Sequence, residues 1–424
     1  MGSSLRYLAR RGALTLLTLI ALLAVPASAS ASIRLGVFNP GGPSDASSAS
    51  AYVEKVGRQA EIAMWYHDFG HTLLTSEERA ALAASGQTPM VTWEPSGQSL
   101  SSIAAGSHDS YIRDSARIAK AWGGELMVRF AHEMNGTWYP WSGDPAAYVA
   151  AWRRVVSLFR EEGATNVRWV WAPNVDSSGS MPFGPYFPGD EWVDYVGLDG
   201  YNFGAASDNG WRSLSEVFAS SYAMLTQLSA RPVVISETSS SETGGDKADW
   251  IREGFISTIP REFPRVAAVV WFNKSQEDDW RIDSSAASLE AFREVANCSL
   301  YGGTTPCSVP SGGTGGDGAD LDVRSIHVPS RVTAPNSGPR GTVSYRLTRR
   351  AKVRIKVQRR RGRHRFGRKA RVSRRGHRGR NRVTLRSLVR GRRLPPGTYR
   401  VVIMASDGRG HRTMPRKKYF RVLR

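Results

Sequence analysis

Residues 33 to 297 show a repeating pattern in which short runs rich in β-branched and aromatic residues are separated by longer amphipathic stretches. Runs of the first kind are typical of buried strands, and stretches of the second kind are typical of helices. The strand-like runs number eight, at residues 33–38, 61–69, 88–95, 125–133, 166–174, 193–202, 231–238 and 266–273. The clearest helical stretches cover residues 109–123, 144–163, 211–230 and 246–257.

Strand and helix alternating in this way predict a parallel sheet with both faces covered by helices. Closed on itself, such a sheet is the (β/α)8 or TIM barrel, the α/β fold that we expect for residues 32–308. An open doubly wound sheet is the alternative, although no glycine-rich phosphate loop opens a first helix. Residues 173–192 show no helical pattern, so the sequence supports eight strands better than eight helices.

The strand-like runs end in polar or aromatic residues. These residues are Asn39, His67, Asp68, Glu94, His132, Glu133, Asn174, Asp199, Tyr201, Asn202, Glu237 and Asn273. In a barrel, the carboxyl ends of all strands open onto one face, where the catalytic residues of this fold lie. Because buried polar groups are costly without a ligand or hydrogen-bond partners, the pattern predicts one shared site at that face.

Glu133 and Glu237 each follow an apolar run and can supply the pair of carboxyl groups that glycoside hydrolysis needs. Sugar rings pack on aromatic side chains, which are plentiful in and around these segments: Trp65, Trp93, Trp138, Tyr139, Trp141, Trp171, Tyr201 and Trp271. A single strand-end glutamate is more often a structural partner, and this alternative stays open for Glu94 and Asp199. A zinc site is disfavoured because Gly136 replaces the second histidine of H-E-x-x-H, and no G-x-S-x-G motif marks a serine nucleophile.

Several longer strings resemble glycoside hydrolase family 26, a family of β-mannanases, some β-1,3-1,4-glucanases and β-xylanases. They are RFAHEMNGTWYPW, AWRRVVSLFREEGATNVRWVWAPN, YFPGDEWVDYVGLDGYN, PVVISETSS, KADWI and VVWFN, in the family's order over most of residues 33 to 297. The resemblance implies that Glu133 is the general acid/base and Glu237 the catalytic nucleophile.

The same resemblance implies further roles. His132 would position the nucleophile or contact the sugar, Tyr201 would orient the nucleophile, and Arg129 would support the site from a buried position. The substrate contacts implied are the aromatic residues Trp138 and Trp271, together with His67 and Trp93, where local similarity is weaker.

The resemblance also implies retention of anomeric configuration through a glycosyl-enzyme intermediate, with no cofactor and no metal. We therefore expect a glycosidase that cleaves β-1,4-mannosidic linkages inside mannan-type polysaccharides. A β-1,3-1,4-glucanase is the first alternative. A glycan-binding protein without catalysis is the second, although such a protein would be expected to lack one of the two carboxyl groups.

The first 31 residues are typical of a secretory signal peptide, because Arg6, Arg10 and Arg11 precede an apolar run and a stretch of small residues. A retained membrane anchor is the alternative, but the apolar run is shorter than the roughly 20 residues of a spanning helix. The pattern predicts a secreted, extracellular protein. Export makes a disulfide between the only two cysteines, Cys298 and Cys307, a reasonable expectation, with two free thiols as the alternative.

Charge divides the chain near residues 309–320, a Gly- and Ser-rich stretch that predicts a flexible linker. Residues 321–424 hold 34 Lys and Arg against 2 Asp and Glu, a formal net charge of +32, whereas the rest of the chain carries −11. Short strand-like runs at residues 321–328, 341–347, 352–360, 381–389 and 398–407, separated by turn signals, predict a small all-β, Ig-like sandwich there.

The basic domain has three interpretations. For an exported module, an anionic cell-wall or plant-wall polymer is the expected partner. Nucleic acid is disfavoured because the most basic stretch has almost no aromatic residues for stacking. A solvated surface without a partner is the third interpretation.

Overall fold

The computed structural model describes residues 32–177, 179–207, 210–307 and most of 321–423, with gaps at 322, 330, 334–340, 362–365, 393, 408–412 and 414. The predicted signal peptide at residues 1–31 and the predicted linker at 309–320 lie outside the described residues. In the described part of the chain, no helix combines the length and the hydropathy needed to cross a bilayer.

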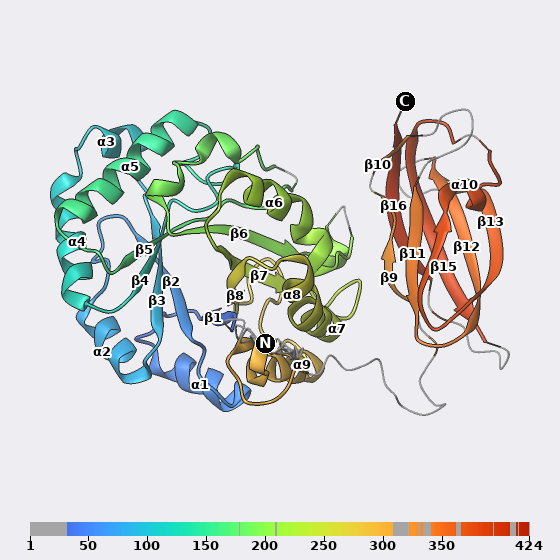
Figure 1. The fold of residues 1–424 in the computed structure, drawn as a ribbon, viewed down its shortest axis with the longest axis horizontal. Coiled ribbons are helices and arrows are strands. Elements are labelled where there is room, and N and C mark those ends of the chain that lie inside the picture. The colour runs from blue at the N-terminus through green and yellow to red at the C-terminus, as the bar shows by residue number, and fades with distance from the viewer. Residues whose placement is uncertain are drawn as a thin grey trace, which may run out of the picture. The chain divides into compact units, whose positions relative to one another are not determined.

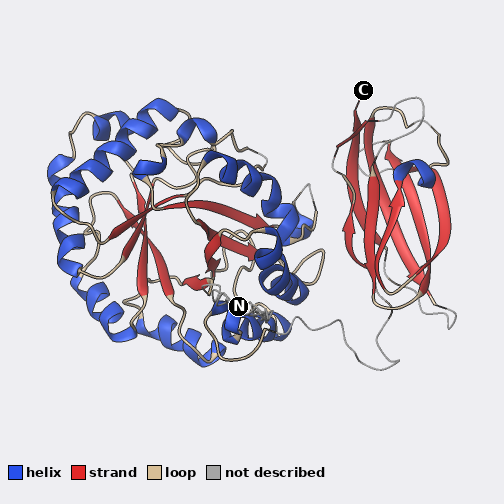
Figure 2. Ribbon diagram, viewed as in Figure 1, coloured by secondary structure: helices blue, strands red, loops and turns tan. Residues whose placement is uncertain are grey.

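Eight parallel strands form a closed barrel in sequence order, which confirms the predicted TIM barrel. The strands are β1 (Arg34–Phe38), β2 (Ile62–Asp68), β3 (Thr88–Glu94), β4 (Leu126–Phe130), β5 (Val167–Trp171), β6 (Tyr195–Asn202), β7 (Val233–Ser240) and β8 (Val266–Phe272). Helices surround them (Figures 1 and 2). These are α1 (Ala46–Val56), α2 (Ser76–Ser85), α3 (Leu100–Ala104), α4 (Asp109–Trp122), α5 (Pro145–Glu161), α6 (Leu214–Leu228), α7 (Lys247–Ile251), α8 (Ile259–Glu262) and α9 (Ala286–Asn297).

The connection from β5 to β6 contains two three-residue 3-10 turns, Gly184–Tyr186 and Asp190–Trp192, where the barrel pattern would place a helix. Its sequence is rich in proline and glycine, which interrupt helical hydrogen bonding. The weak helical signal in this stretch therefore reflects a real departure from eight-fold regularity.

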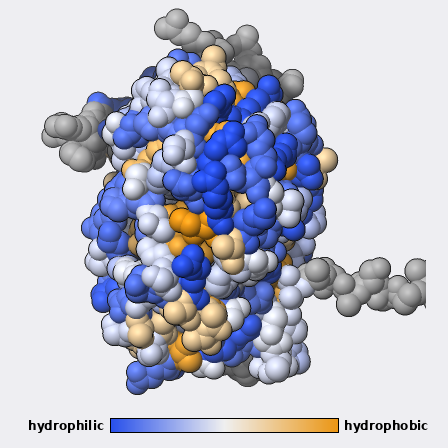
Figure 3. Space-filling view, turned by 90° about the vertical axis from the view of Figure 1, so that its left-hand side faces the viewer, coloured by the Kyte–Doolittle hydropathy of each residue, from blue (hydrophilic) through white to orange (hydrophobic). Residues whose placement is uncertain are grey.

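Successive residues of each barrel strand face two different apolar layers. One layer fills the barrel and includes Met64, Met90, Val234 and Val270, whereas the other lies between strands and helices. Because side chains alternate along a strand, a shift of one residue moves a side chain from one layer to the other. Outside, the side of the molecule shown in Figure 3 is mostly hydrophilic, with small apolar spots.

Local sequence signals define several helix starts. Thr75 and Glu78 form a capping box at α2, in which the Thr75 side chain accepts the Glu78 backbone N–H and the Glu78 carboxylate accepts the Thr75 N–H. Ser213 and Glu216 do the same at α6. Such caps satisfy backbone donors that the first helical turn leaves without partners.

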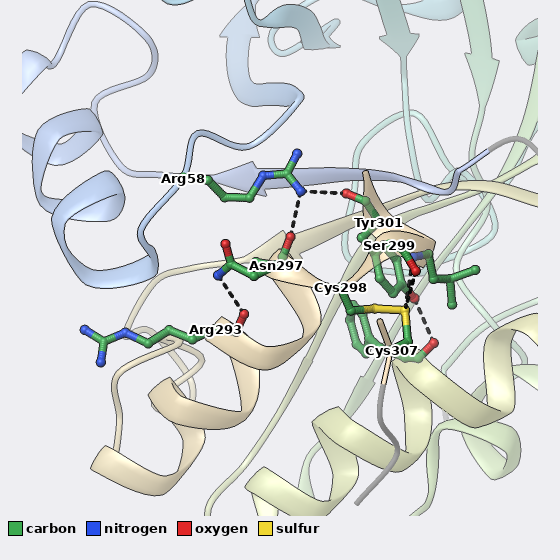
Figure 4. Close-up of a disulfide and its surroundings, with 10 residues drawn as sticks. Arg58, Arg293, Asn297, Cys298, Ser299, Tyr301 and Cys307 are labelled. Carbon is green, nitrogen blue, oxygen red and sulfur yellow. Dashed lines mark hydrogen bonds between the residues drawn. A yellow bond between two sulfur atoms is a disulfide. The ribbon is translucent and has the colours of Figure 1, made fainter. Parts of the chain in front are cut away.

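A disulfide joins Cys298 and Cys307 at the end of the barrel domain, with 4.6 Å between their Cα atoms (Figure 4). Nearby, Arg58 donates to the carbonyl oxygens of Ala296 and Tyr301, at 2.7 and 2.8 Å. These bonds connect the last turn of α9 and the chain after it to the loop that follows α1. The C-terminal end of the barrel domain is thus held by a covalent bond and by the partly buried guanidinium of Arg58.

Residues 321–423 form two β-sheets around a separate apolar core, which confirms the predicted sandwich. One sheet has the order β10 (Arg331–Thr333), β16 (Arg416–Leu423), β15 (Gly397–Ser406), β12 (Ala351–Arg360), β13 (Phe366–Gly376). The other has the order β14 (Gly379–Thr384), β11 (Thr342–Leu347), β9 (Val323–His327), and a short helix, α10 (Leu385–Leu388), follows β14. The sequence runs did not reveal β10, β13 and β16, because arginine and lysine obscure their alternation. The Ig-like assignment stays a prediction.

Candidate active site

Glu133 lies in a tight turn just beyond β4, which ends at Phe130, and not on the strand itself as its sequence suggested. Two non-glycine residues in this turn have positive φ angles, Ala131 at 44° and Glu133 at 49°. The Glu133 N–H donates to the Ala172 carbonyl oxygen at 2.8 Å, which fixes the turn against the end of β5. Such strained conformations persist only where their surroundings impose them, and they cluster at functional sites.

Glu237 lies within β7 beside an irregularity in the strand. Leu198 pairs with Ile235, but the next residue of β6, Asp199, pairs with Glu237, so that Ser236 is an extra residue. A bulge of this kind changes the direction in which the following side chain points. Ser236 donates to Asp199, and Glu237 also points into the barrel, although strict alternation would direct it toward the helices.

Three donors hold the Glu237 carboxylate. The Tyr66 hydroxyl donates to Oε1 at 2.5 Å, the Tyr201 hydroxyl donates to Oε2 at 2.6 Å, and the Arg129 guanidinium donates to Oε1. Burial and the negative charge of Glu237 raise the pKa of both tyrosines well above the usual range, so they remain protonated donors. Three donors from three different strands fix the orientation of the Glu237 carboxylate.

Arg129 is fully buried and connects the nucleophile candidate to the barrel interior. Its guanidinium donates to Asp199 Oδ2 at 2.6 Å and to Thr92 Oγ1 at 2.7 and 3.0 Å, besides its bond to Glu237. One cation thus lies between two buried carboxylates. Arg129 lies in a buried position, as the resemblance implied, and its supporting role stays a prediction. Asp199 is a hydrogen-bond partner of Arg129 and Ser236.

Glu133 has a different set of neighbours. Asn174 donates to its Oε1 at 2.6 Å, and the Trp138 indole N–H donates to its Oε2 at 2.7 Å. Asn135 accepts the Asn174 backbone N–H at 2.8 Å and donates to its carbonyl oxygen, which holds Asn174 in place. Trp138 is 45% exposed, and Gly136 leaves room for its indole, since a Cβ there would overlap the ring.

The environment of Glu133 raises its pKa to about 7, first through burial and second through the negative charge of Glu237, against the two hydrogen bonds that favour ionisation. Glu133 can therefore hold a proton near neutral pH. A protonated carboxyl group beside an ionised one is the arrangement that a general acid and a nucleophile require.

His132 is buried between aromatic rings, with its ring centroid 4.7 Å from that of Tyr139 and 5.7 Å from that of Tyr66. Burial, together with the positive charge of Arg129, lowers the pKa of His132 well below the usual range, so its imidazole is neutral. Its Nδ1 lies 3.9 Å from Glu94 Oε1, too far for a hydrogen bond, and has no protein partner. Burial and the charge of Asp68 raise the pKa of Glu94 to about 7.

These two polar groups face the same region as the carboxylate pair and leave hydrogen-bonding capacity unused. An incoming hydroxyl group would satisfy the free His132 nitrogen. In the described residues, no cluster of three or more His, Cys, Asp or Glu side chains could hold a metal ion.

Comparison with known proteins identifies the domain. The family model described as glycosyl hydrolase family 26 matches residues 112–238, a range that includes both glutamates. The barrel is a family 26 domain. Its relatives include Endoglucanase H of Acetivibrio thermocellus, 37% identical over 277 residues that cover 62% of this chain and 30% of the relative.

A second relative is the mannan endo-1,4-beta-mannosidase A and B of Caldalkalibacillus mannanilyticus, 25% identical over 198 residues, covering 43% of this chain and 35% of the relative. The chain spans about a third of the length of these two relatives. Among solved structures, a Cellulomonas fimi endo-beta-1,4-mannanase double mutant aligns with a TM-score of 0.49 and 17% identity, covering 92% of this chain and 94% of that chain.

Three residues predicted to contact substrate do not reach the mouth of the family 26 barrel. Trp93 and Trp271 are fully buried in the layer between strands and helices. His67 also points outward, where its Nε2 lies 2.8 Å from Glu78 Oε1 of α2. Their assignment as substrate contacts needs correction, because each lies on the side of its strand that faces the helices.

Two aromatic residues of the barrel interior near Glu237 were not singled out by the sequence. Tyr66 precedes His67 and points into the barrel, and the Trp280 ring packs against Tyr201 with centroids 5.2 Å apart. Trp280 lies on the loop after β8, outside every strand-like run. For Tyr66 no sequence signal was available, because the strands of a barrel are apolar on both faces and do not reveal which residues point inward.

Proposed function

We propose that the chain is a retaining glycoside hydrolase in which Glu133 is the general acid/base and Glu237 the nucleophile. The observation that carries the proposal is the contrast between the two carboxyl groups. Glu133 has a pKa of about 7 and neutral donors, whereas Glu237 is bonded to a guanidinium and two hydroxyl groups.

The reaction then has two steps. In the first, Glu237 attacks the anomeric carbon while Glu133 transfers its proton to the leaving oxygen, and the glycosidic C–O bond breaks. In the second, water attacks the glycosyl-enzyme ester, Glu133 accepts the proton of that water, and Glu237 is released as a carboxylate. Because the glycosyl-enzyme removes the negative charge of Glu237, the first step lowers the pKa of Glu133 and prepares it to act as a base.

We infer that the substrate is the β-1,4-linked backbone of a mannan-type polysaccharide, cleaved internally. Relatives named mannan endo-1,4-beta-mannosidase support this substrate. A β-glucanase is the second candidate, favoured by a specific observation: the match at 37% identity over 277 residues is to a protein named an endoglucanase. Mannose and glucose differ in the orientation of the 2-hydroxyl group, so contacts beside the reacting carbon would decide between them.

The test is reducing-sugar release by the full chain from mannan, mixed-linkage glucan and xylan. Activity on mannan supports the first candidate, and activity confined to mixed-linkage glucan supports the second. If none of the three polysaccharides is cleaved, the substrate class is wrong. NMR during the first minutes should show the β anomer as the initial product, and initial release of the α anomer would contradict retention.

Two variants separate the roles of the carboxyl groups. Glu237→Ala should lose roughly 10⁴-fold or more in kcat on polysaccharide and on an activated aryl glycoside, because both need the nucleophile. Glu133→Ala should lose about 10²- to 10⁴-fold on polysaccharide but keep the first step on the aryl glycoside, whose leaving group needs no proton. Equal losses on both substrates in the two variants would contradict the assignment.

We also propose that the protein is secreted. The sequence of residues 1–31 supports this location, as does the presence of a disulfide at Cys298 and Cys307. N-terminal sequencing of protein recovered from the culture medium of an expressing bacterium should begin shortly after Ala29 or Ala31. Recovery of the intact N-terminus in the membrane fraction would contradict the proposal.

A further inference from the structure

The five-stranded sheet of the C-terminal sandwich has an unusual composition. Its strands β10, β12, β13, β15 and β16 contain 16 Lys and Arg and no Asp or Glu. The domain as a whole has two acidic residues, Asp322 and Asp407, and neither belongs to these strands. The sheet therefore has no internal counter-charges.

The outer face of this sheet, which we call the cationic face, carries much of that charge. In β12, Val353, Ile355 and Val357 point into the sandwich core, so the alternate residues point outward. The outward residues of β12 and their neighbours on adjacent strands include Lys352, Arg354, Lys356, Arg371, Arg375, Arg400, Lys417 and Arg421.

Several of these cations lie directly opposite one another. Lys356 pairs with Arg371 and Lys352 pairs with Arg375 across β12 and β13. Like charges placed directly opposite on neighbouring strands destabilise a sheet. The cationic face thus carries repulsion that an anionic partner would relieve.

Protection of sheet edges does not account for this arrangement. Lysine and arginine on an edge strand prevent pairing with other chains, and the edges here are β10 and β13. β12, however, lies between β15 and β13 and is not an edge strand. Edge protection therefore does not explain Lys352, Arg354 and Lys356. Their charge needs another explanation.

We propose that the cationic face binds a polyuronate, an acidic polysaccharide of the polygalacturonate type, and that it anchors the enzyme to the matrix in which its neutral substrate is embedded. This role rests on the proposed glycan hydrolysis. Arginine binds carboxylates through paired N–H groups, and a sheet face with cations on several neighbouring strands matches an extended polymer with many carboxylates. The chain outside residues 321–424 has a net charge of −11 and would be repelled by that matrix, so the basic domain supplies the attraction.

Nucleic acid fits the cationic face less well. The major groove of DNA admits a helix or a two-stranded ribbon, whereas this sheet has five strands. Single strands bind by stacking successive bases on aromatic rings. Among the described residues of this face, Tyr419 offers an exposed ring, but the ring of Phe366 in β13 is covered by the Arg400 guanidinium, 3.8 Å from its centroid, so the face lacks a row of stacking positions.

The test measures binding of the full chain carrying Glu237→Ala, so that hydrolysis plays no part. The probes are polygalacturonate and its fully methyl-esterified form, which keeps the backbone and loses the charge. At about 50 mM salt we expect retention on polygalacturonate only, with affinity falling steeply as salt rises. Equal binding to both polymers, or no binding to either, would overturn the proposal.

Matched variants locate the surface. Lys352→Gln, Arg371→Gln and Arg375→Gln together remove three exposed cations from the cationic face, and we expect the affinity to fall at least ten-fold. The control is Arg346→Gln, Arg380→Gln and Arg382→Gln, which removes three exposed cations from the outer face of the other sheet. This control should lose no more than two- to three-fold.

An equal loss of affinity in both variants would show that binding is not specific to the cationic face. Tighter binding to double-stranded DNA than to polygalacturonate would show that the ligand is not a polyuronate. Near-native circular dichroism is required of both variants. Hydrolysis of soluble substrate without polygalacturonate binding would refute this inference alone, whereas polygalacturonate binding without hydrolysis would refute only the proposed activity.

Discussion

The surroundings of the two glutamates differ in kind. Around Glu133, the donors are the amide of Asn174 and the indole of Trp138, both uncharged, and Trp138 is nearly half exposed. Around Glu237, the donors are a buried guanidinium and two hydroxyl groups. The same side chain thus has a pKa raised to about 7 in one pocket and is bonded to a cation in the other.

This contrast shows that position in the fold brings the pair together, whereas the neighbours divide the chemistry between them. Each carboxyl group is positioned by a local irregularity. Glu133 lies in a turn with positive φ angles after β4, and Glu237 follows a bulge in β7. The charge of Glu237 then contributes to the raised pKa of Glu133. Acid and nucleophile are therefore coupled, and changes near one should be detectable at the other.

The largest effect is expected from removing the cation that distinguishes the Glu237 pocket. Arg129→Met leaves Glu237 and Asp199 buried without their shared counter-charge. Breaking a buried ion pair by removing one partner costs about 3 to 5 kcal/mol. We expect a loss of that size in the free energy of unfolding, measured by urea denaturation, and a roughly 10³-fold loss of kcat/KM.

The double variant with Asp199→Asn serves as the control. Neutralising Asp199 should recover part of the lost stability, because one uncompensated buried charge disappears, but it should not recover activity. If the double variant loses as much stability as the Arg129→Met and Asp199→Asn variants lose together, the two residues are not coupled and this explanation is wrong.

A smaller effect is expected from the hydroxyl groups. Tyr66→Phe removes the donor to Oε1 of Glu237, and Tyr201→Phe removes the donor to Oε2. A hydrogen bond to a charged group contributes about 1.5 to 3 kcal/mol, so each variant should lose roughly 10- to 100-fold in kcat. Steady-state kinetics on the preferred polysaccharide measure this, and an unchanged kcat in Tyr66→Phe would remove Tyr66 from the site.

In the Glu133 pocket, Trp138→Phe should change the pH dependence of kcat/KM more than it changes kcat. The acid must be protonated, so kcat/KM of the parent should fall as pH rises through about 7, the pKa of Glu133. The Trp138 hydrogen bond favours the ionised carboxylate, and its loss should shift this limb to higher pH, with kcat at pH 6 changing only a few-fold. A shift toward lower pH would contradict the role of Glu133 as the acid, and Glu133→Gln should abolish the limb.

The sequence predicted the barrel, the sandwich and the two carboxyl groups, because these depend on patterns that extend over many residues. It could not predict which residues of an apolar strand point inward. His67, Trp93 and Trp271 were expected at the substrate, but they face the helices. The turn at Glu133 and the bulge at Ser236 lie equally beyond sequence reasoning, since each depends on contacts with a neighbouring strand.

The smallest effect on catalysis is therefore expected at His67, one residue from a donor to the nucleophile. His67 contacts Glu78, a residue of the α2 capping box, and His67→Ala should lower the free energy of unfolding by about 1 kcal/mol. Its kcat and KM should stay within two-fold of the parent, whereas Tyr66→Phe at the adjacent position should lose far more activity. Neighbouring side chains on a strand face opposite sides. A ten-fold rise in KM for His67→Ala would mean that His67, and not Tyr66, faces the barrel interior, and Tyr66 could then not be a donor to Glu237.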